Sequence, residues 1–175
     1  HVDTTGEPSD EAPQDVWLWI KVGGDDRYRL ERFHDEAGMA RGPAVRVLLD
    51  TDGDDVYDST VAGGDASAGV LGVSLHWDGG GRDEWRCMRW CQGAALLGAA
   101  ALINEGAATD HLRAQTQAQA HAVGGLALLA SNTRRVIEGS AATHYEALSD
   151  AQASAGPSGV ALLVDGQGDD RYSLA

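Results

Sequence analysis

An octapeptide with acidic, glycine and aromatic residues in fixed places recurs along this chain of 175 residues. Complete copies begin at Asp50, Asp78 and Asp165, a shortened copy spans residues 23–28, and two degenerate copies span residues 105–112 and 138–145. The small residues at the fourth position follow one another at steps of 29, 28, 27, 33 and 27 residues. Such a period predicts stacked supersecondary units, each of which needs its neighbours to bury its apolar face.

Each repeat places a short apolar segment before the octapeptide and a small-residue segment after it. The apolar segments are residues 16–20, 45–49, 70–75, 99–103, 126–129 and 160–164. Their length and the turn residues around them favour buried strands. With a second short strand at the aromatic position and a third in the small-residue segment, the pattern predicts an all-β fold. We expect a parallel β-solenoid (β-helix) of about six coils, with roughly 27–29 residues per coil.

An alternative unit contains a helix, because residues 92–103 and 115–131 are rich in alanine, which has the highest helix propensity. Gly93 and Gly98 interrupt the first segment, and Gly124 and Gly125 interrupt the second. These glycines favour the solenoid over the helical unit.

Two regions are expected along the chain. Residues 1–15 are acidic, polar and proline-bearing, which is typical of a linker or a loosely held arm. Residues 16–175 are expected to form the repeat domain. Because the chain starts at His1 and ends directly after an acidic turn, we expect a fragment of a longer protein, with the array continuing into a further segment or another subunit.

The formal net charge of −14 at pH 7 limits the expected partners. Nucleic acids and anionic membranes attract clustered lysine and arginine, so neither is an expected partner. The chain has no apolar stretch of the length that crosses a bilayer, which argues against membrane insertion. The acidity is compatible with cation binding, and it is equally explained as a means of keeping the chain soluble.

Cys87 and Cys91 are the two cysteines of the chain. On one continuous strand they would lie about 13 Å apart. That separation is too large for a disulfide, so a bridge between them requires an intervening turn.

The acidic turns are candidate sites for a hard cation such as calcium. In a parallel solenoid the turns of neighbouring coils stack, so their carboxylates face one another and repel unless a cation lies between them. The candidate metal ligands are Asp25, Asp26, Asp50, Asp52, Asp54, Asp55, Asp78, Asp83, Asp165, Asp169 and Asp170. The same side chains could instead cap backbone amides of the turns without any ion, since Asp and Gly are common turn residues.

The core pattern Gly-x-Asp-x-aromatic occurs at residues 24–28, 53–57, 81–85 and 168–172, and it resembles the Gly-Gly-x-Gly-x-Asp-x-apolar repeat of RTX calcium β-rolls. The resemblance implies secretion and calcium-dependent folding. The RTX unit repeats about every nine residues, whereas this one has a period of about three such units, so only the metal-binding turn is carried over. The chain is also similar to uncharacterised bacterial proteins with Gly-Asp-Asp-x-Tyr repeats, a resemblance that implies no particular activity.

Two further columns of stacked side chains are expected from the repeat. The aromatic position holds Tyr28, Tyr57, Trp85, Leu112, Tyr145 and Tyr172. This column predicts an internal or edge stacking ladder or, alternatively, a strip that binds carbohydrate. Gln92, Gln119 and Gln152 lie at equivalent positions and predict a structural glutamine ladder.

Together these features predict a non-enzymatic structural or binding module of a bacterial surface or secreted protein, stabilised by calcium. Its expected partners are another protein or further segments of the same polypeptide. One alternative is a carbohydrate-active β-helix enzyme that acts on an acidic polysaccharide through bound calcium, and another is a module that assembles end to end. The sequence has no nucleophile-elbow, zinc-protease or phosphate-loop motif, and acid pairs are too frequent in it to identify a glycosidase.

Overall fold

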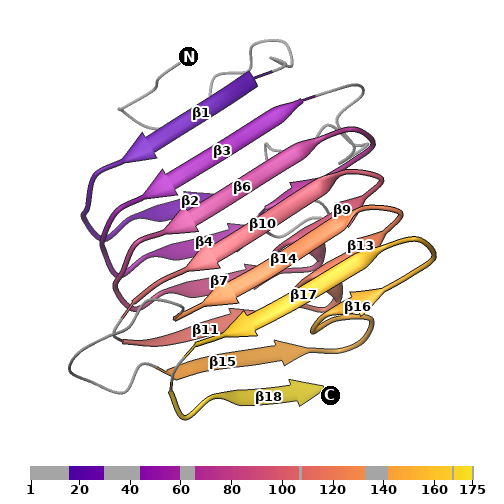
Figure 1. Cartoon of the computed structure of the whole chain (residues 1–175). Helices are drawn as coiled ribbons and strands as arrows, with labels where there is room; N and C mark the ends of the chain where they lie inside the picture. The colour runs from indigo at the N-terminus through magenta and orange to yellow at the C-terminus, as the bar shows by residue number, and fades with distance from the viewer. Residues whose placement is uncertain are drawn as a thin grey trace.

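The computed structural model describes residues 16–29, 44–59, 66–106, 108–132, 142–166 and 168–174 (Figure 1). These residues form strands and turns. The described part of the chain contains no helix that could span a lipid bilayer. Residues 1–15, which the sequence predicts to be a linker or arm, lie outside the described residues.

Three main parallel sheets and a small two-stranded one run along the molecule, and successive repeats add one strand to each of the two six-stranded sheets. Sheet A contains β1 (Val16–Lys21), β3 (Val45–Asp50), β6 (Val73–Asp78), β10 (Ala99–Asn104), β14 (Leu126–Ser131) and β17 (Val160–Asp165). Sheet B contains β2 (Arg27–Arg29), β4 (Val56–Ser59), β7 (Glu84–Cys87), β11 (Thr109–Arg113), β15 (Ala142–Ala147) and β18 (Arg171–Leu174). Sheet C contains β5 (Ser67–Ala68), β9 (Ala94–Leu96), β13 (His121–Val123) and β16 (Ser154–Ala155), while β8 (Arg89–Cys91) pairs with β12 (Thr116–Ala118).

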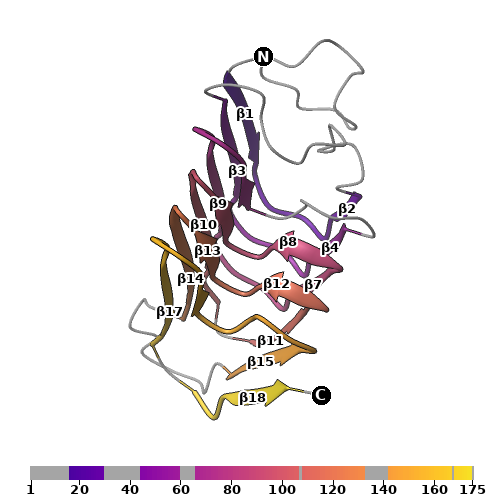
Figure 2. The ribbon, with the colours of Figure 1, turned by 90° about the vertical axis from the view of Figure 1, so that its right-hand side faces the viewer.

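The chain passes through sheets A, B and C in turn and so forms a parallel β-solenoid, as predicted. Four coils have described strands in all three sheets: β3–β4–β5, β6–β7–β9, β10–β11–β13 and β14–β15–β16. The pairs β1–β2 and β17–β18 supply partial coils at the two ends (Figure 2). The prediction of about six coils therefore corresponds to four complete coils between two partial ones. The helical alternative is wrong, because residues 92–103 and 115–131 contain strands of the solenoid.

The interior of the solenoid is filled by the inward-facing positions of all three main sheets, with small alanines from sheet C. Side chains alternate between the two faces along each strand, which buries residues such as Leu102 of sheet A. The aromatic column of sheet B stacks opposite them, with ring centroids 4.7 Å apart for Tyr28 and Tyr57 and 3.6 Å apart for Tyr57 and Trp85. Apart from Tyr172 in the last coil, this column is buried. It is therefore an internal stacking ladder, and the prediction of a carbohydrate-binding strip is wrong.

The glutamine ladder joins consecutive coils at the corner that follows sheet B. Gln92, Gln119 and Gln152 all have positive φ angles, of 51°, 51° and 55°. Gln119 Nε2 donates to the carbonyl oxygen of Leu112 in its own coil at 2.8 Å and to that of Glu146 in the next coil at 3.1 Å. The other two glutamines make equivalent pairs of hydrogen bonds. Each glutamine thus joins two coils by donating hydrogen bonds to backbone carbonyl oxygens of both.

Cys87 and Cys91 form a disulfide, with Cα atoms 6.5 Å apart. The required turn is present, because β7 ends at Cys87 and β8 begins at Arg89. Trp90 in this segment has a φ of 53°, which bends the chain back on itself. The extended-strand separation of about 13 Å therefore does not apply at this corner.

Candidate metal centre

The aspartates at the sixth position of the octapeptide form a ladder along the turn between sheets A and B. The backbone N–H of each donates to the carboxylate Oδ1 of the aspartate in the following coil. The distances are 2.7 Å from Asp26 to Asp55, 3.0 Å from Asp55 to Asp83 and 2.9 Å from Asp83 to Asp110. One oxygen of each carboxylate therefore caps a backbone amide of a neighbouring coil, which is the turn-capping role expected of such residues.

A second column of acids lies opposite, at the ends of the strands of sheet A. The strand register stacks Asp50 on Asp78 at this inward position. Both aspartates are fully buried. The Tyr28 hydroxyl donates to Asp50 Oδ2, and the Tyr57 hydroxyl donates to Asp78 Oδ2 at 2.5 Å. The aromatic ladder thus holds this column in place.

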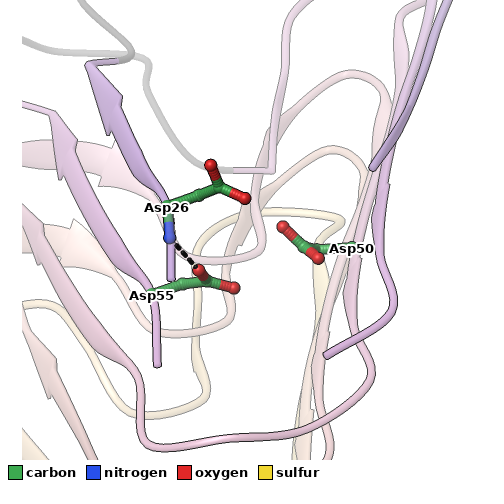
Figure 3. A group of neighbouring side chains, drawn as sticks. All are labelled: Asp26, Asp50 and Asp55. Atoms are coloured by element: carbon green, nitrogen blue, oxygen red, sulfur yellow. Dashed lines mark hydrogen bonds between the residues drawn. The ribbon is translucent and has the colours of Figure 1, made fainter. Parts of the chain in front are cut away.

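The two columns bring carboxylates together in two groups that share Asp55. One group is Asp26, Asp50 and Asp55, and the other is Asp55, Asp78 and Asp83. In each group the ligand oxygens lie within 4.8 Å of one another. Because calcium binds oxygen at about 2.3–2.6 Å, oxygens at this separation can all contact one ion. Figure 3 shows the first group, in which Asp26 and Asp55 project from adjacent turns and Asp50 approaches from the facing strand end.

Several oxygens in these groups are buried and have no hydrogen-bond partner. They are Asp26 Oδ2, Asp50 Oδ1, Asp55 Oδ2 and Asp83 Oδ2. Asp55 and Asp83 are each only 1% exposed. A buried carboxylate oxygen without a donor is strongly unfavourable, and it is relieved by a proton or by a cation. The residues present therefore fit an oxygen-liganded cation.

The pKa values of these aspartates reflect the same crowding. Burial raises the pKa of Asp55 to about 7, although the N–H of Asp26 stabilises the ionised form. Burial likewise raises the pKa of Asp110 to about 7. The pKa values of Asp78 and Asp83 lie well above the usual range, first because both are buried and further because neighbouring carboxylates repel them. The ionised groups are thus penalised in the absence of a positive charge.

In the next coil, β10–β11–β13, an amide side chain takes the place of one of the two facing carboxylates. Asn104 stacks on Asp78 in the strand register. Its Nδ2 donates to Asp110 Oδ2 at 2.8 Å. At the other end of the column, Lys21 stacks on Asp50, and its Nζ lies 3.1 Å from Asp26 Oδ1. Between Lys21 and Asn104 in this column, Asp50 and Asp78 face other carboxylates, those of Asp55 and Asp83. A cation therefore fits best at the second and third coils.

Five of the eleven predicted ligands come together in these two groups, and three others lie on the same turns but outside the groups. Asp25 and Asp54 form an outer, exposed ladder, in which Asp54 N–H donates to Asp25 Oδ1 at 3.1 Å and Arg82 N–H donates to Asp54 Oδ1 at 2.9 Å. Asp52 is exposed. These side chains cap turns or face solvent.

The three predicted ligands of the last coil are not brought together in such a group among the described residues. Asp165 Oδ2 accepts a hydrogen bond from the Tyr172 hydroxyl at 2.9 Å. Asp170 Oδ1 accepts one from Thr143 N–H at 2.8 Å and so extends the capping ladder. Asp169 is exposed.

Sequence reasoning missed Asp110 and Asn104 as members of the two columns. The copy at residues 105–112 was aligned on Glu105, whereas the strand register places Asn104, one residue earlier, beside Asp78. The alternation of the strand carried the signal, because Leu102 and Asn104 face inward and Ile103 faces outward. Asp110, at the sixth position of that copy, was visible in the repeat but stood in a degenerate copy.

A shallow groove of about 360 Å³ lies on the outside of the second group. It is lined by Asp54, Asp55, Val56, Arg82, Asp83, Glu84, His111 and Arg113. Asp55 and Asp83 belong to both the groove and the second group, so the groove lies next to the buried carboxylates.

Function is inferred from this geometry and from the fold. Comparison of the chain with protein-family models, with curated proteins and with solved structures gave no match.

Proposed function

We propose that the chain is a non-enzymatic β-solenoid module whose first three coils are joined by calcium ions bound between buried aspartates. The observation that carries the proposal is the pair of carboxylate groups with unpartnered, buried oxygens. The donors are all oxygen atoms, which suits calcium rather than a transition metal that prefers nitrogen or sulfur.

The ions would act as cross-links between coils. Asp26 belongs to the first coil, Asp50 and Asp55 to the second, and Asp78 and Asp83 to the third. A solenoid is stabilised mainly by the interfaces between neighbouring coils. A cation that removes the repulsion at two successive interfaces would therefore couple calcium binding to folding of this end of the array.

We further propose that the module belongs to a secreted or surface protein of a bacterium. The Cys87–Cys91 disulfide supports this location, because disulfides persist in oxidising compartments. In this setting its partners would be further segments of the same polypeptide or another surface protein.

Calorimetric titration of calcium into chelator-treated protein tests the proposal. We expect heat of binding together with a gain in the β signal of circular dichroism. Asp55→Asn should weaken both binding events, because Asp55 is shared by the two groups, whereas Asp169→Asn removes an exposed acid and should bind as the parent does. If millimolar calcium produces neither heat nor a spectral change, the chain does not bind calcium. The aspartates then serve only as caps of the turns.

The groove supports a second candidate function, which is binding or cleavage of an acidic polysaccharide. Arg82 and Arg113 come from two neighbouring coils and lie beside Asp54 and Glu84. An arginine pair next to acids is the arrangement expected for a sugar carboxylate near a bound cation. Arg113→Ala should then abolish binding of an oligogalacturonate in calcium, whereas Arg27→Ala, outside the groove, should not. Wild-type protein that neither binds nor cleaves this probe at millimolar concentration would dismiss the candidate.

A further inference from the structure

The outer face of sheet A is apolar at every position that the strand register assigns to it. Three outward positions recur in all six strands. They hold Val16, Val45, Val73, Ala99, Leu126 and Val160; Leu18, Val47, Leu75, Ala101, Leu128 and Leu162; and Ile20, Leu49, Trp77, Ile103, Ala130 and Val164. A solvated strand normally alternates apolar and polar residues, so this face departs from the expected pattern.

The outer face of sheet B shows what the same fold does when a face is solvated. Its outward positions include Arg27, Asp58, Glu84, Arg86, His111, Arg113, His144, Glu146 and Arg171. Several of them form ion pairs across coils, such as Arg113 Nε with Glu146 Oε2 at 3.0 Å and Arg27 Nη2 with Asp58 Oδ2 at 3.6 Å. Only Val56 among the described outward positions of this face is a large apolar residue. The apolar character of sheet A is therefore specific to that face.

Much of the sheet A face is open to solvent in the single chain. Val16 is 62% exposed, Leu126 52%, Val160 60% and Leu162 51%. The face points toward the viewer in Figure 1 and lies on one side of the molecule in Figure 2. Contiguous exposed apolar surfaces of this kind mark interaction sites.

We propose that the outer face of sheet A binds the same face of a second copy of this chain. Six strands spaced about 4.8 Å apart, each six residues long at about 3.3 Å per residue, cover roughly 600 Å² on each copy. Two such faces remove about 1,200 Å² from water, which is the lower end of the size of specific interfaces. The area is sufficient for a dimer without any other contact.

The distribution of charge determines which surface a second copy can use. Each copy carries a formal net charge of −14, so two copies repel through most of their surface. The sheet A face has no charged residue at its outward positions, which makes it the surface through which like-charged copies meet at least cost. Two sheets packed face to face lie about 10 Å apart, with side chains such as Leu75 and Leu128 interdigitating near the centre. The contact is the same patch on both copies and closes as a two-fold dimer.

Sedimentation equilibrium of the full chain in calcium tests the proposal. The wild type should have twice the mass of the 18.3 kDa chain at micromolar concentration. Leu75→Lys combined with Leu128→Lys places like charges in the apolar contact and should weaken association by at least about 100-fold. Val56→Lys, the matched change on the outer face of sheet B, should leave the dimer intact. Circular dichroism confirms that each variant is folded, and Ala101→Lys, a single change at the centre of the face, replaces the double variant if that one is unfolded.

A wild-type chain that stays monomeric at about 100 μM overturns the proposal. So does a dimer that the lysine variants leave intact. A mass that keeps growing with concentration and ignores the lysine variants indicates end-to-end pairing through β1 and β17 instead. A monomer that binds neutral phosphatidylcholine vesicles assigns the face to lipid and also contradicts the dimer.

Discussion

At the scale of single residues, the inner aspartates use their two oxygens for different purposes. Asp55 Oδ1 accepts a backbone N–H from the preceding coil, while Oδ2 has no partner. The capping and metal-binding interpretations of these residues are therefore compatible, because each concerns a different oxygen. The third and fourth coils differ at this position in the column. Asn104 has an amide nitrogen that donates a hydrogen bond to Asp110, whereas the ionised Asp78 can only accept hydrogen bonds.

Substitution of Asp78 by Asn should give the third coil the uncharged side chain that the fourth coil has at Asn104. The substitution removes one buried negative charge beside Asp55 and Asp83, so the melting temperature of the chelator-treated variant should fall less than that of the parent as the pH rises. Loss of one charged ligand should weaken calcium binding by roughly tenfold or more. Thermal melting and calcium titration measure both effects.

Asp52→Asn is the control for this substitution, because it makes the same change of charge on an exposed turn outside both groups. It should alter neither quantity. Equal calcium affinity in Asp78→Asn and Asp52→Asn would mean that Asp78 is not a ligand.

At the scale of elements, the repeat predicts the strands well and their register less well. Short apolar segments between turn residues correctly locate the strands of sheet A, because burial on the inward side requires them in every coil. In the copy at residues 105–112 only the first position differs from the alignment of the repeat: Asn104, rather than Glu105, lies beside Asp78, whereas Leu112 lies beside Trp85 as predicted. Strand alternation, in which a shift of one residue exchanges the two faces, would have corrected it. The unpartnered carboxylate oxygens of the two groups could not be predicted, because the spacing of the repeat does not show which atoms are in contact.

The glycine at the fourth position of the octapeptide is explained by the contact between coils. A Cβ at Gly81, where φ is 120°, would overlap the carbonyl oxygen of Gly53 in the preceding coil. Gly24 has a similar φ of 106°, but in the first coil its nearest atom would be Asp26 Oδ2 at 3.8 Å. The two positions share the backbone strain and differ in the space available.

Gly81→Ala should therefore cost about 2–4 kcal/mol in the free energy of unfolding, and Gly24→Ala about 1 kcal/mol. Urea unfolding of the two variants under the same conditions measures the difference. Equal losses would show that the repeat glycine is needed for its φ angle alone.

At the scale of the whole molecule, the protein is an acidic solenoid with two faces of different character and one corner where like charges crowd together. Sheet A presents an apolar face, sheet B a face of ion pairs, and the corner between them holds the carboxylate groups. A solenoid lacks a single central core, so a repulsive contact between two coils weakens the array locally.

Because the pKa values of the crowded aspartates are shifted, the stability of the solenoid is expected to depend on pH. Asp55, Asp78, Asp83 and Asp110 have folded-state pKa values raised above their ordinary value, so the stability they contribute is fully present below about pH 4 and is lost as the pH rises to about 7, or to about 9 for Asp83. Burial lowers the pKa of His76 to about 3, so its contribution is lost only as the pH falls below about 6.5. Between pH 7 and 9 the remaining pH dependence of these groups therefore comes mainly from Asp83, whose pKa is about 9.

The most direct test of the central claim is the melting temperature between pH 7 and 9, measured in chelator and in millimolar calcium. In chelator the melting temperature should fall as the pH rises, because Asp83, whose pKa is about 9, ionises beside the carboxylates of Asp78 and Asp110. Calcium should abolish most of this fall and raise the melting temperature by about 5–10 °C when it is present at about 100 times its Kd. Identical melting curves in chelator and calcium across this range would contradict the claim that cations join the first coils.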